Sequence, residues 1–133
     1  MASIHKEILV DTPAESAWSA VRDVGQIHVR LVPGFVADCK LEGNTRIVTF
    51  ANGLVVREPI LDIDDGNRRH AWAAVGGEFT HYSASLQVFA EGADRCRLVW
   101  IADFLPDALA PTVETMIEQG MSVMKQTLER ARG

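Results

Sequence analysis

The sequence predicts an α+β fold, in which a curved antiparallel sheet of about seven strands is covered by one long C-terminal helix. Short turn signals separate six apolar segments between residues 35 and 104, which is typical of an antiparallel meander. Residues 107–130 then carry apolar side chains at spacings of three and four, which indicates one face of a helix. Together these patterns predict a sheet with one covered face.

The N-terminal part predicts one strand and two short helices. Residues 4–10 are β-branched and apolar, as in a strand. The next residues predict a helix start, with Thr12 as N-cap, Pro13 at the first helical position and Glu15 completing a capping box. This helix is expected to stop near Gly25, and residues 25–33 are predicted to form a second short helix or a helical turn.

Six further strands are predicted at residues 35–42, 45–50, 54–63, 68–75, 79–90 and 95–104. Pro59 lacks the N–H that a sheet ladder needs, so it predicts an edge or a bulge in its strand. Alternation separates a covered face from an outer face, on which His81 lies. The covered face of the last three strands includes Trp72, Tyr82, Ala84, Leu86, Trp100 and Phe104.

The C-terminal helix has an unusual apolar face. It is rich in methionine, the most adaptable apolar side chain, and it carries Gly120 mid-helix at a cost of about 1 kcal/mol relative to alanine. A glycine that faces a sheet leaves room for a close strand or for a ligand. We therefore predict a cavity between sheet and helix, with Met116, Gly120, Met121 and Met124 on the helical side.

Composition and charge exclude several classes of function. The 133 residues are 47% hydrophobic and 23% charged, as expected for one globular domain spanning residues 1–133. A net charge of −5 without a basic run argues against nucleic acid or an anionic membrane as partner. No signal peptide and no apolar run of the ~20 residues that cross a bilayer are present, so we expect a cytoplasmic protein without a membrane span.

The sequence contains no motif that is typical of a metal site, a cofactor site or a catalytic nucleophile. The four histidines show no metal-ligand spacing, and no phosphate-binding loop or GxSxG motif occurs. Cys39 and Cys96 lie in separate predicted strands and are expected to be reduced, buried thiols. We expect no metal and no cofactor.

The order of strand, two short helices, six strands and long helix resembles the START-like or SRPBCC superfamily, also called helix-grip or birch-pollen-allergen-like. Residues 68–82 (RRHAWAAVGGEFTHY) and 99–106 (VWIADFLP) resemble the bacterial polyketide cyclase/dehydrase branch, and are also similar to plant abscisic acid receptors. The resemblance implies an apolar ligand between sheet and helix, lined in part by Glu58, Trp72, Tyr82 and Ala84. Ala37 stands where the plant receptors have a pocket lysine, which argues against recognition of a carboxylate ligand there.

Two side chains are candidates for proton transfer. Alternation along the strand places Glu58 on the same covered face as Val56 and Ile60. Its carboxyl group could therefore hold a ligand hydroxyl or act as a base with a raised pKa. The other interpretation is that a neighbouring arginine pairs with Glu58 at the surface. His70 has an intrinsic pKa near neutrality and could be a general acid or base, or a structural histidine at the rim.

The predicted function is binding of a small, largely apolar molecule of aromatic, polyketide-like or lipid-like character. The predicted ligand contacts are Trp72, Tyr82, Ala84, Leu86, Trp100, Phe104, Met116, Gly120, Met121 and Met124. The alternative is an enzyme of the polyketide cyclase/dehydrase type, with Glu58 or His70 moving a proton. A third interpretation is an interaction module that forms a homodimer through exposed tryptophan or methionine. His28 and Arg30 are expected to lie at one end of the cavity.

Overall fold

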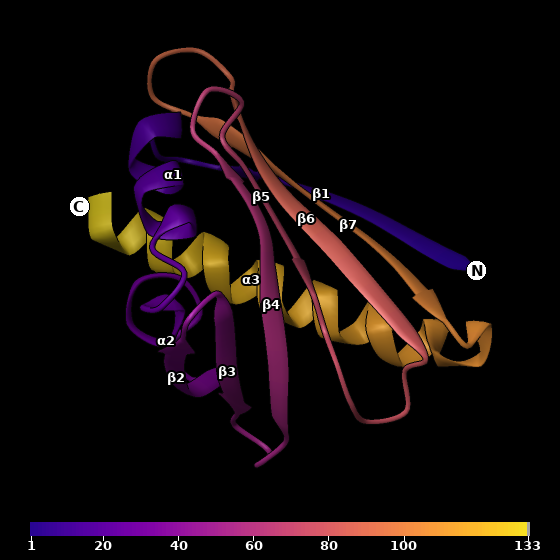
Figure 1. Cartoon of the computed structure of the whole chain (residues 1–133). Coiled ribbons are helices and arrows are strands. Elements are labelled where there is room, and N and C mark those ends of the chain that lie inside the picture. The colour runs from indigo at the N-terminus through magenta and orange to yellow at the C-terminus, as the bar shows by residue number, and fades with distance from the viewer. Residues whose placement is uncertain (133) are drawn as a thin grey trace.

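A computed structural model describes residues 1–132 and shows one curved sheet with helices on its concave side (Figure 1). In chain order the elements are β1 (Ala2–Val10), α1 (Ala14–Arg22), α2 (Ile27–Arg30), β2 (Val36–Glu42), β3 (Thr45–Phe50), β4 (Val55–Asp64), β5 (Arg69–Ala73), β6 (His81–Ala90), β7 (Cys96–Leu105), the 3₁₀ turn η1 (Asp107–Leu109) and α3 (Ala110–Arg132). This order confirms the predicted α+β helix-grip fold with two short helices after the first strand.

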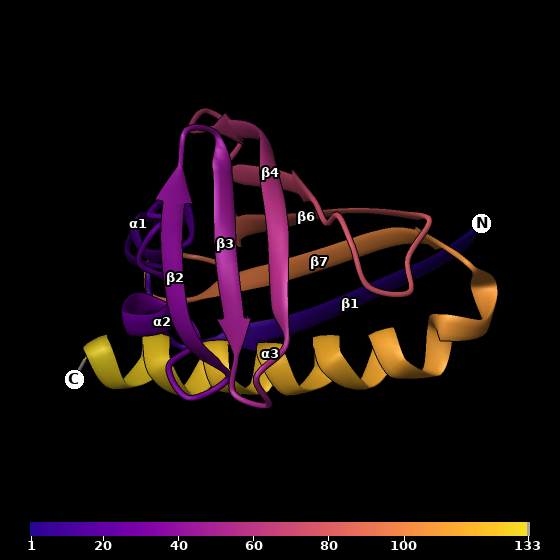
Figure 2. The same ribbon diagram turned by 60° about the horizontal axis from the view of Figure 1, so that its bottom comes forward.

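The seven strands form one antiparallel sheet in the order β1-β7-β6-β5-β4-β3-β2. The first strand therefore pairs with the last, and the other strands follow as a meander. Figure 2 shows β2, β3 and β4 running across the direction of β6, β7 and β1, with α3 lying along the open side of the bend. The bend keeps part of the sheet away from the helix, and the cavity described below lies in that space.

Alternation along the strands and the helix produces the core as predicted. The inward residues of β7 from Cys96 to Phe104 are all buried, as are Tyr82, Ala84, Leu86 and Val88 of β6, whereas His81 is exposed. On α3 the buried positions follow the predicted stripe. They are Val113, Ile117, Gly120, Met121, Met124 and Leu128.

The predicted capping box at the start of α1 is wrong. The helix begins at Ala14, its N-cap is Pro13, and no side chain caps it. Thr12 is 1% exposed and is packed into the core. Glu15 instead accepts hydrogen bonds from the Arg68 guanidinium, across the gap to the start of β5. Burial of Thr12 and the ion pair of Glu15 remove both partners that a capping box needs.

The irregularity predicted at Pro59 lies immediately after it in β4. Pro59 pairs with Thr45 at the start of β3, and the register with β5 shifts between Ile60 and Asp62. Glu58 precedes this bulge and stands directly opposite Arg46 in the regular part of the ladder. The bulge therefore does not reverse the inward direction of Glu58.

Two further observations concern thiols and membranes. Cys39 and Cys96 are free and buried, and burial raises the pKa of both thiols. Among residues 1–132, no helix is long and apolar enough to cross a bilayer.

Candidate functional site

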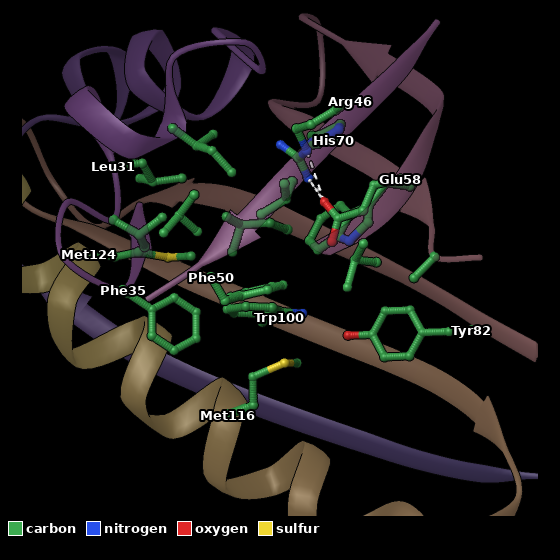
Figure 3. Close-up of a pocket in the computed structure, with 18 of the residues that line it drawn as sticks. Leu31, Phe35, Arg46, Phe50, Glu58, His70, Tyr82, Trp100, Met116 and Met124 are labelled. Atoms are coloured by element: carbon green, nitrogen blue, oxygen red, sulfur yellow. Dashed lines mark hydrogen bonds and ion pairs between the residues drawn. The ribbon is translucent and has the colours of Figure 1, made fainter. Parts of the chain in front are cut away.

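A cavity of about 110 Å³ lies between the sheet, the segment around α2, and α3 (Figure 3). Its walls are apolar except where Arg46, Glu58, His70 and Tyr82 reach it. The apolar wall is formed by Val21, Ile27, Leu31, Val32, Phe35, Val36, Val48, Phe50, Leu54, Val56, Trp72, Ala74, Phe79, Leu86, Trp100, Met116 and Met124.

Six of the ten residues predicted to contact a ligand line this cavity. They are Trp72, Tyr82, Leu86, Trp100, Met116 and Met124. The remaining four, Ala84, Phe104, Gly120 and Met121, are buried in the packed layer beside it. Phe104, for example, stacks on Tyr82 with ring centroids 6.3 Å apart and does not line the cavity. The sheet-and-helix location is as predicted, and the ligand contacts themselves stay a prediction.

Gly120 accommodates a side chain of the sheet. A methyl group built on Gly120 would lie 3.0 Å from Cζ3 of Trp100 and 3.5 Å from Cε2 of Phe35. Both side chains also line the cavity. The glycine therefore lets α3 approach Trp100 closely.

We expect Gly120→Ala to change the free energy of unfolding by less than about 1 kcal/mol. Removing a helical glycine gains ~1 kcal/mol, and overpacking costs about 1–3 kcal/mol, reduced here because the indole can shift toward the cavity. Urea denaturation measures the balance. A loss of 3 kcal/mol or more would mean that Trp100 is held too firmly to move.

Arg46 and Glu58 form a buried ion pair at one side of the cavity. Directly opposed residues of antiparallel strands share a face, so β3 and β4 bring the two side chains together. Arg46 donates from Nε and Nη2 to Oε1 of Glu58, at 2.9 and 2.7 Å. The guanidinium also lies over the Trp72 ring, 5.5 Å from its centroid. The pairing predicted as an alternative at the surface thus occurs in the interior.

The environment of Glu58 acts on its charge in two directions. Burial raises the pKa of the carboxyl group, and the Arg46 guanidinium opposes this rise. Both hydrogen bonds end on Oε1, and Figure 3 shows the second carboxylate oxygen directed toward the cavity without a partner among the residues drawn. Glu58 is therefore anchored by one oxygen and presents the other to the site.

His70 is a neutral imidazole with an unpaired nitrogen. It is 2% exposed, and its ring stacks on Trp72 with centroids 4.8 Å apart. Burial, aided by the positive charge of Arg46, lowers the pKa of His70 to about 3. Its Nε2 is buried without a hydrogen-bond partner among the described residues. A buried nitrogen of this kind needs a partner. The atom has almost no accessible surface, so a ligand in the cavity would contact it only after neighbouring side chains shift.

Tyr82 and Trp100 bring two more polar groups to the cavity from the neighbouring strands β6 and β7. Figure 3 shows the Tyr82 hydroxyl and the Trp100 indole nitrogen facing one another. Trp100 Nε1 is buried, and its N–H lies near enough to the Tyr82 hydroxyl to donate to it and so to oppose the rise in the Tyr82 pKa. Burial and the nearby Glu58 carboxylate raise the pKa of Tyr82, which keeps the phenol protonated.

An outer hollow of about 340 Å³ adjoins the cavity between the β3–β4 turn and the first half of α3. Phe35, Phe50, Leu54 and Met116 line both spaces and thus form the wall between them. Phe35 and Phe50 meet edge to face, with centroids 5.6 Å apart. Movement of these side chains would join the two spaces into a larger site.

The residues predicted near the end of the cavity have other roles. Arg30 binds Asp23 and the backbone oxygen of Ser19, each at 3.0 Å, and neither Arg30 nor His28 lines the cavity. Ile27 and Leu31, on and just after α2, close this side instead. Within the described chain, His28 Nδ1 is buried and unpaired.

Sequence reasoning missed Arg46, which is the strongest polar feature of the site. The sequence did contain a pattern that could have identified Arg46, because strand alternation places it on the same covered face as Val48 and Phe50.

Among residues 1–132, no three His, Cys, Asp or Glu side chains are grouped closely enough to hold a metal ion.

Comparison with known families decides the assignment. Residues 1–130 match the family model described as polyketide cyclase/dehydrase and lipid transport. The chain belongs to this family. No curated protein sequence matches it.

Solved structures show the same fold for this polyketide cyclase/dehydrase family member. An uncharacterised protein from Bacillus thuringiensis has a TM-score of 0.86 at 16% identity, covering 96% of this chain and 98% of its own. Norcoclaurine synthase from Thalictrum flavum, solved with dopamine and hydroxybenzaldehyde, has a TM-score of 0.75 at 20% identity, covering 98% and 85%. The di-domain ARO/CYC protein BexL has a TM-score of 0.85 at 18% identity, covering 97% of this chain and 47% of BexL. At these identities the similarity concerns the fold alone.

Proposed function

We propose that this protein binds one small, largely apolar and electrically neutral molecule in the cavity between the sheet and α3. The observation that carries the proposal is an apolar hollow whose wall includes only a few polar side chains, Arg46, Glu58, His70 and Tyr82. Such a combination of apolar wall and few polar groups is typical of small-molecule sites. His70, Tyr82 and Trp100 would orient the ligand, and the aromatic and methionine side chains would surround its apolar part.

The charges of the site favour a neutral ligand. The positive charge of Arg46 is offset by Glu58 at hydrogen-bonding distance. His70 adds no charge near neutral pH because its pKa is lowered to about 3. A charged ligand would lose its hydration without meeting an unpaired opposite charge, which is costly in a buried site.

The volume favours a single ring or a molecule of similar size. An engineered cavity of about 150 Å³ in another protein binds benzene, so 110 Å³ suits a ligand of about one ring. At ~24 cal/mol per Å³, a dry cavity of this size costs about 2.6 kcal/mol of packing. A larger polyketide-like molecule would need the outer hollow as well.

The second candidate is a cyclase/dehydrase-type enzyme, which the free His70 Nε2 and the second oxygen of Glu58 favour. Two observations weigh against it. Within the described residues no hydrogen bond joins Glu58 to His70, and Glu58 is held by Arg46. A histidine with a pKa of about 3 is also a weak base, whereas general bases work best near the operating pH. Binding is therefore the function that the geometry supports best.

Native mass spectrometry of the protein purified from its own host tests the proposal directly. We expect a neutral small molecule to remain bound in the gas phase and to be released on denaturation. A ligand that carries several charges would contradict the proposed chemistry. Conversion of the released compound by fresh protein would favour the enzyme.

A substitution that fills the cavity gives a second test. Ala74 lines the cavity, whereas the next residue, Val75, does not line it and is 58% exposed. We expect Ala74→Phe to weaken binding of a single-ring probe, toluene, at least about tenfold, because the added ring occupies its space. Val75→Phe adds a ring outside and is the matched control. NMR titration measures both affinities, and equal binding by Ala74→Phe and the control would place toluene elsewhere.

A further inference from the structure

We propose that Glu58 selects the charge of the ligand, because its carboxylate occupies the place at Arg46 that the carboxylate of a ligand would take. The position beside Arg46 is suited to a carboxylate, and the chain fills it with its own side chain. Carboxylic acids are thereby excluded from the cavity, and neutral molecules are admitted. This inference rests on the proposed binding function and names the residue that decides which ligands the cavity accepts.

The Arg46 guanidinium is held by contacts that do not involve Glu58. Its side chain is 4% exposed and lines the cavity. The guanidinium lies over the Trp72 ring, 5.5 Å from the ring centroid, and Nη1 donates to the backbone oxygen of Val24 at 3.5 Å. The ring and the backbone oxygen together orient the planar group. Arg46 is therefore expected to keep its position when Glu58 is replaced.

Glu58 occupies the edge of the guanidinium that carries Nε and Nη2. Both nitrogens donate to Oε1 of Glu58, at 2.9 and 2.7 Å. Two N–H groups in a fixed planar arrangement are what a carboxylate needs for a strong, charge-assisted pair. The remaining nitrogen, Nη1, is directed to Val24. A ligand carboxylate would have to displace Glu58 to reach the same two donors.

One acidic side chain, Glu58, balances the charge of the described cavity wall. The other ionisable side chains among the described lining residues are Arg46, His70 and Tyr82. His70 is neutral at pH 7 because its pKa is lowered to about 3, and burial raises the pKa of Tyr82, so its phenol stays protonated. Without Glu58 the wall would present an unpaired, buried cation. A carboxylate would satisfy that cation, and a neutral molecule would not.

Glu58→Ala with added acetate tests this assignment. The substitution removes one methylene and one carboxylate, which together have the heavy atoms of an acetate ion. Acetamide has nearly the same shape without the charge and is the matched ligand. We expect acetate to bind the variant at least about tenfold more tightly than acetamide, as for hydrogen bonds to a charged group. Thermal unfolding at pH 7 and constant ionic strength measures both affinities from the rise of Tm with ligand concentration.

Three proteins serve as controls for the acetate measurement. Wild type should show no preference for acetate, because Glu58 already fills the place. Val56→Ala opens space elsewhere in the cavity wall and leaves the ion pair intact, so it should show no preference either. Arg46→Met combined with Glu58→Ala opens the same space without the cation and should lose the preference.

The ligand specificity of the whole cavity gives a second readout. Benzoate and benzamide have nearly the same shape and differ in charge. We expect the ratio of benzoate affinity to benzamide affinity, measured by NMR titration, to rise at least about tenfold from wild type to Glu58→Ala. Glu58→Gln keeps the volume of the side chain and removes its charge, so it should shift the ratio in the same direction. A purely structural role for Glu58 would weaken both ligands alike.

The outcomes separate the role of Glu58 from the binding function. Equal affinities of acetate and acetamide in Glu58→Ala, or an unchanged benzoate-to-benzamide ratio in both variants, would overturn the role of Glu58 and leave toluene binding by wild type untouched. Failure of wild type to bind toluene would overturn the proposed binding function, and the acetate measurement would still decide the role of Glu58. Folding of Glu58→Ala with acetate but not with acetamide would support the proposal. If this variant folds with neither, the ratio in Glu58→Gln decides the question.

Discussion

Arg46→Met is expected to lower the free energy of unfolding by about 3–5 kcal/mol at neutral pH, the range for removal of one partner of a buried ion pair. The reason is the group left behind. Glu58 is 8% exposed, and within the described residues its carboxylate is held by Nε and Nη2 of Arg46. Without Arg46 its carboxylate would be an uncompensated buried charge. Urea denaturation at pH 7 measures the loss.

The double substitution Arg46→Met with Glu58→Leu is the matched control. It removes both charges and keeps apolar volume, so we expect it to recover most of the stability, because buried ion pairs are often replaceable by packed apolar residues. The single variant should also become relatively more stable on acidification, since a protonated Glu58 is neutral. A single variant within 1 kcal/mol of wild type would show that Glu58 finds water or another partner.

Acidification is expected to destabilise the protein through His70, by a total of about 4–5 kcal/mol between pH 6.5 and pH 3. The pKa of His70 is about 3 in the folded protein, compared with about 6.5 in an unfolded chain. Above pH 6.5 both states are neutral, and this group adds no pH dependence. Below that value the unfolded chain binds the proton and the folded protein does not, so stability falls by about 1.4 kcal/mol per pH unit.

His70→Gln isolates this contribution. The raised pKa of Glu58 acts in the opposite sense, because its protonation favours the folded state in acid and this effect is lost as the pH rises through the folded pKa. Subtracting the variant's unfolding free energies from those of wild type at each pH removes Glu58 and the surface carboxylates to first order. We expect the difference to be flat above pH 6.5 and to slope below it. Parallel curves down to pH 4 would mean that water or a partner stabilises the His70 imidazolium in the folded protein.

Gly120 shows how far a helical pattern can be interpreted without coordinates. Its spacing on α3 predicted that it faces the sheet, and the structure places it there, 3.0 Å from Trp100 for an added methyl group. The pattern left open whether a strand or a ligand fills the space. The choice depends on how the indole on β7 is oriented, and that orientation comes from packing against residues far away in the chain.

For Arg46 and the cavity wall, too, strand alternation predicts which face a residue occupies, and the tertiary structure decides what the residue contacts. Inward parity could have identified Arg46, but its partner depends on the register that places it opposite Glu58. Ala84 and Phe104 share the inward face with Tyr82 and Leu86, yet they lie outside the cavity lining. Alternation along a strand tells which face of the sheet a residue occupies. The bend of the sheet decides which part of that face lies away from α3 and therefore lines the cavity.

The sequence by itself determined the strand and helix order and the buried face of each element. These follow from periodicities of 2 and 3.6 residues, which are local properties of the chain. Only the tertiary structure decided the Arg46–Glu58 pair, the neutral and unpaired His70, and the position of the Tyr82 hydroxyl against the Trp100 nitrogen. Those features arise where separate strands meet, because burial and hydrogen bonding depend on distances between residues that the chain alone does not set.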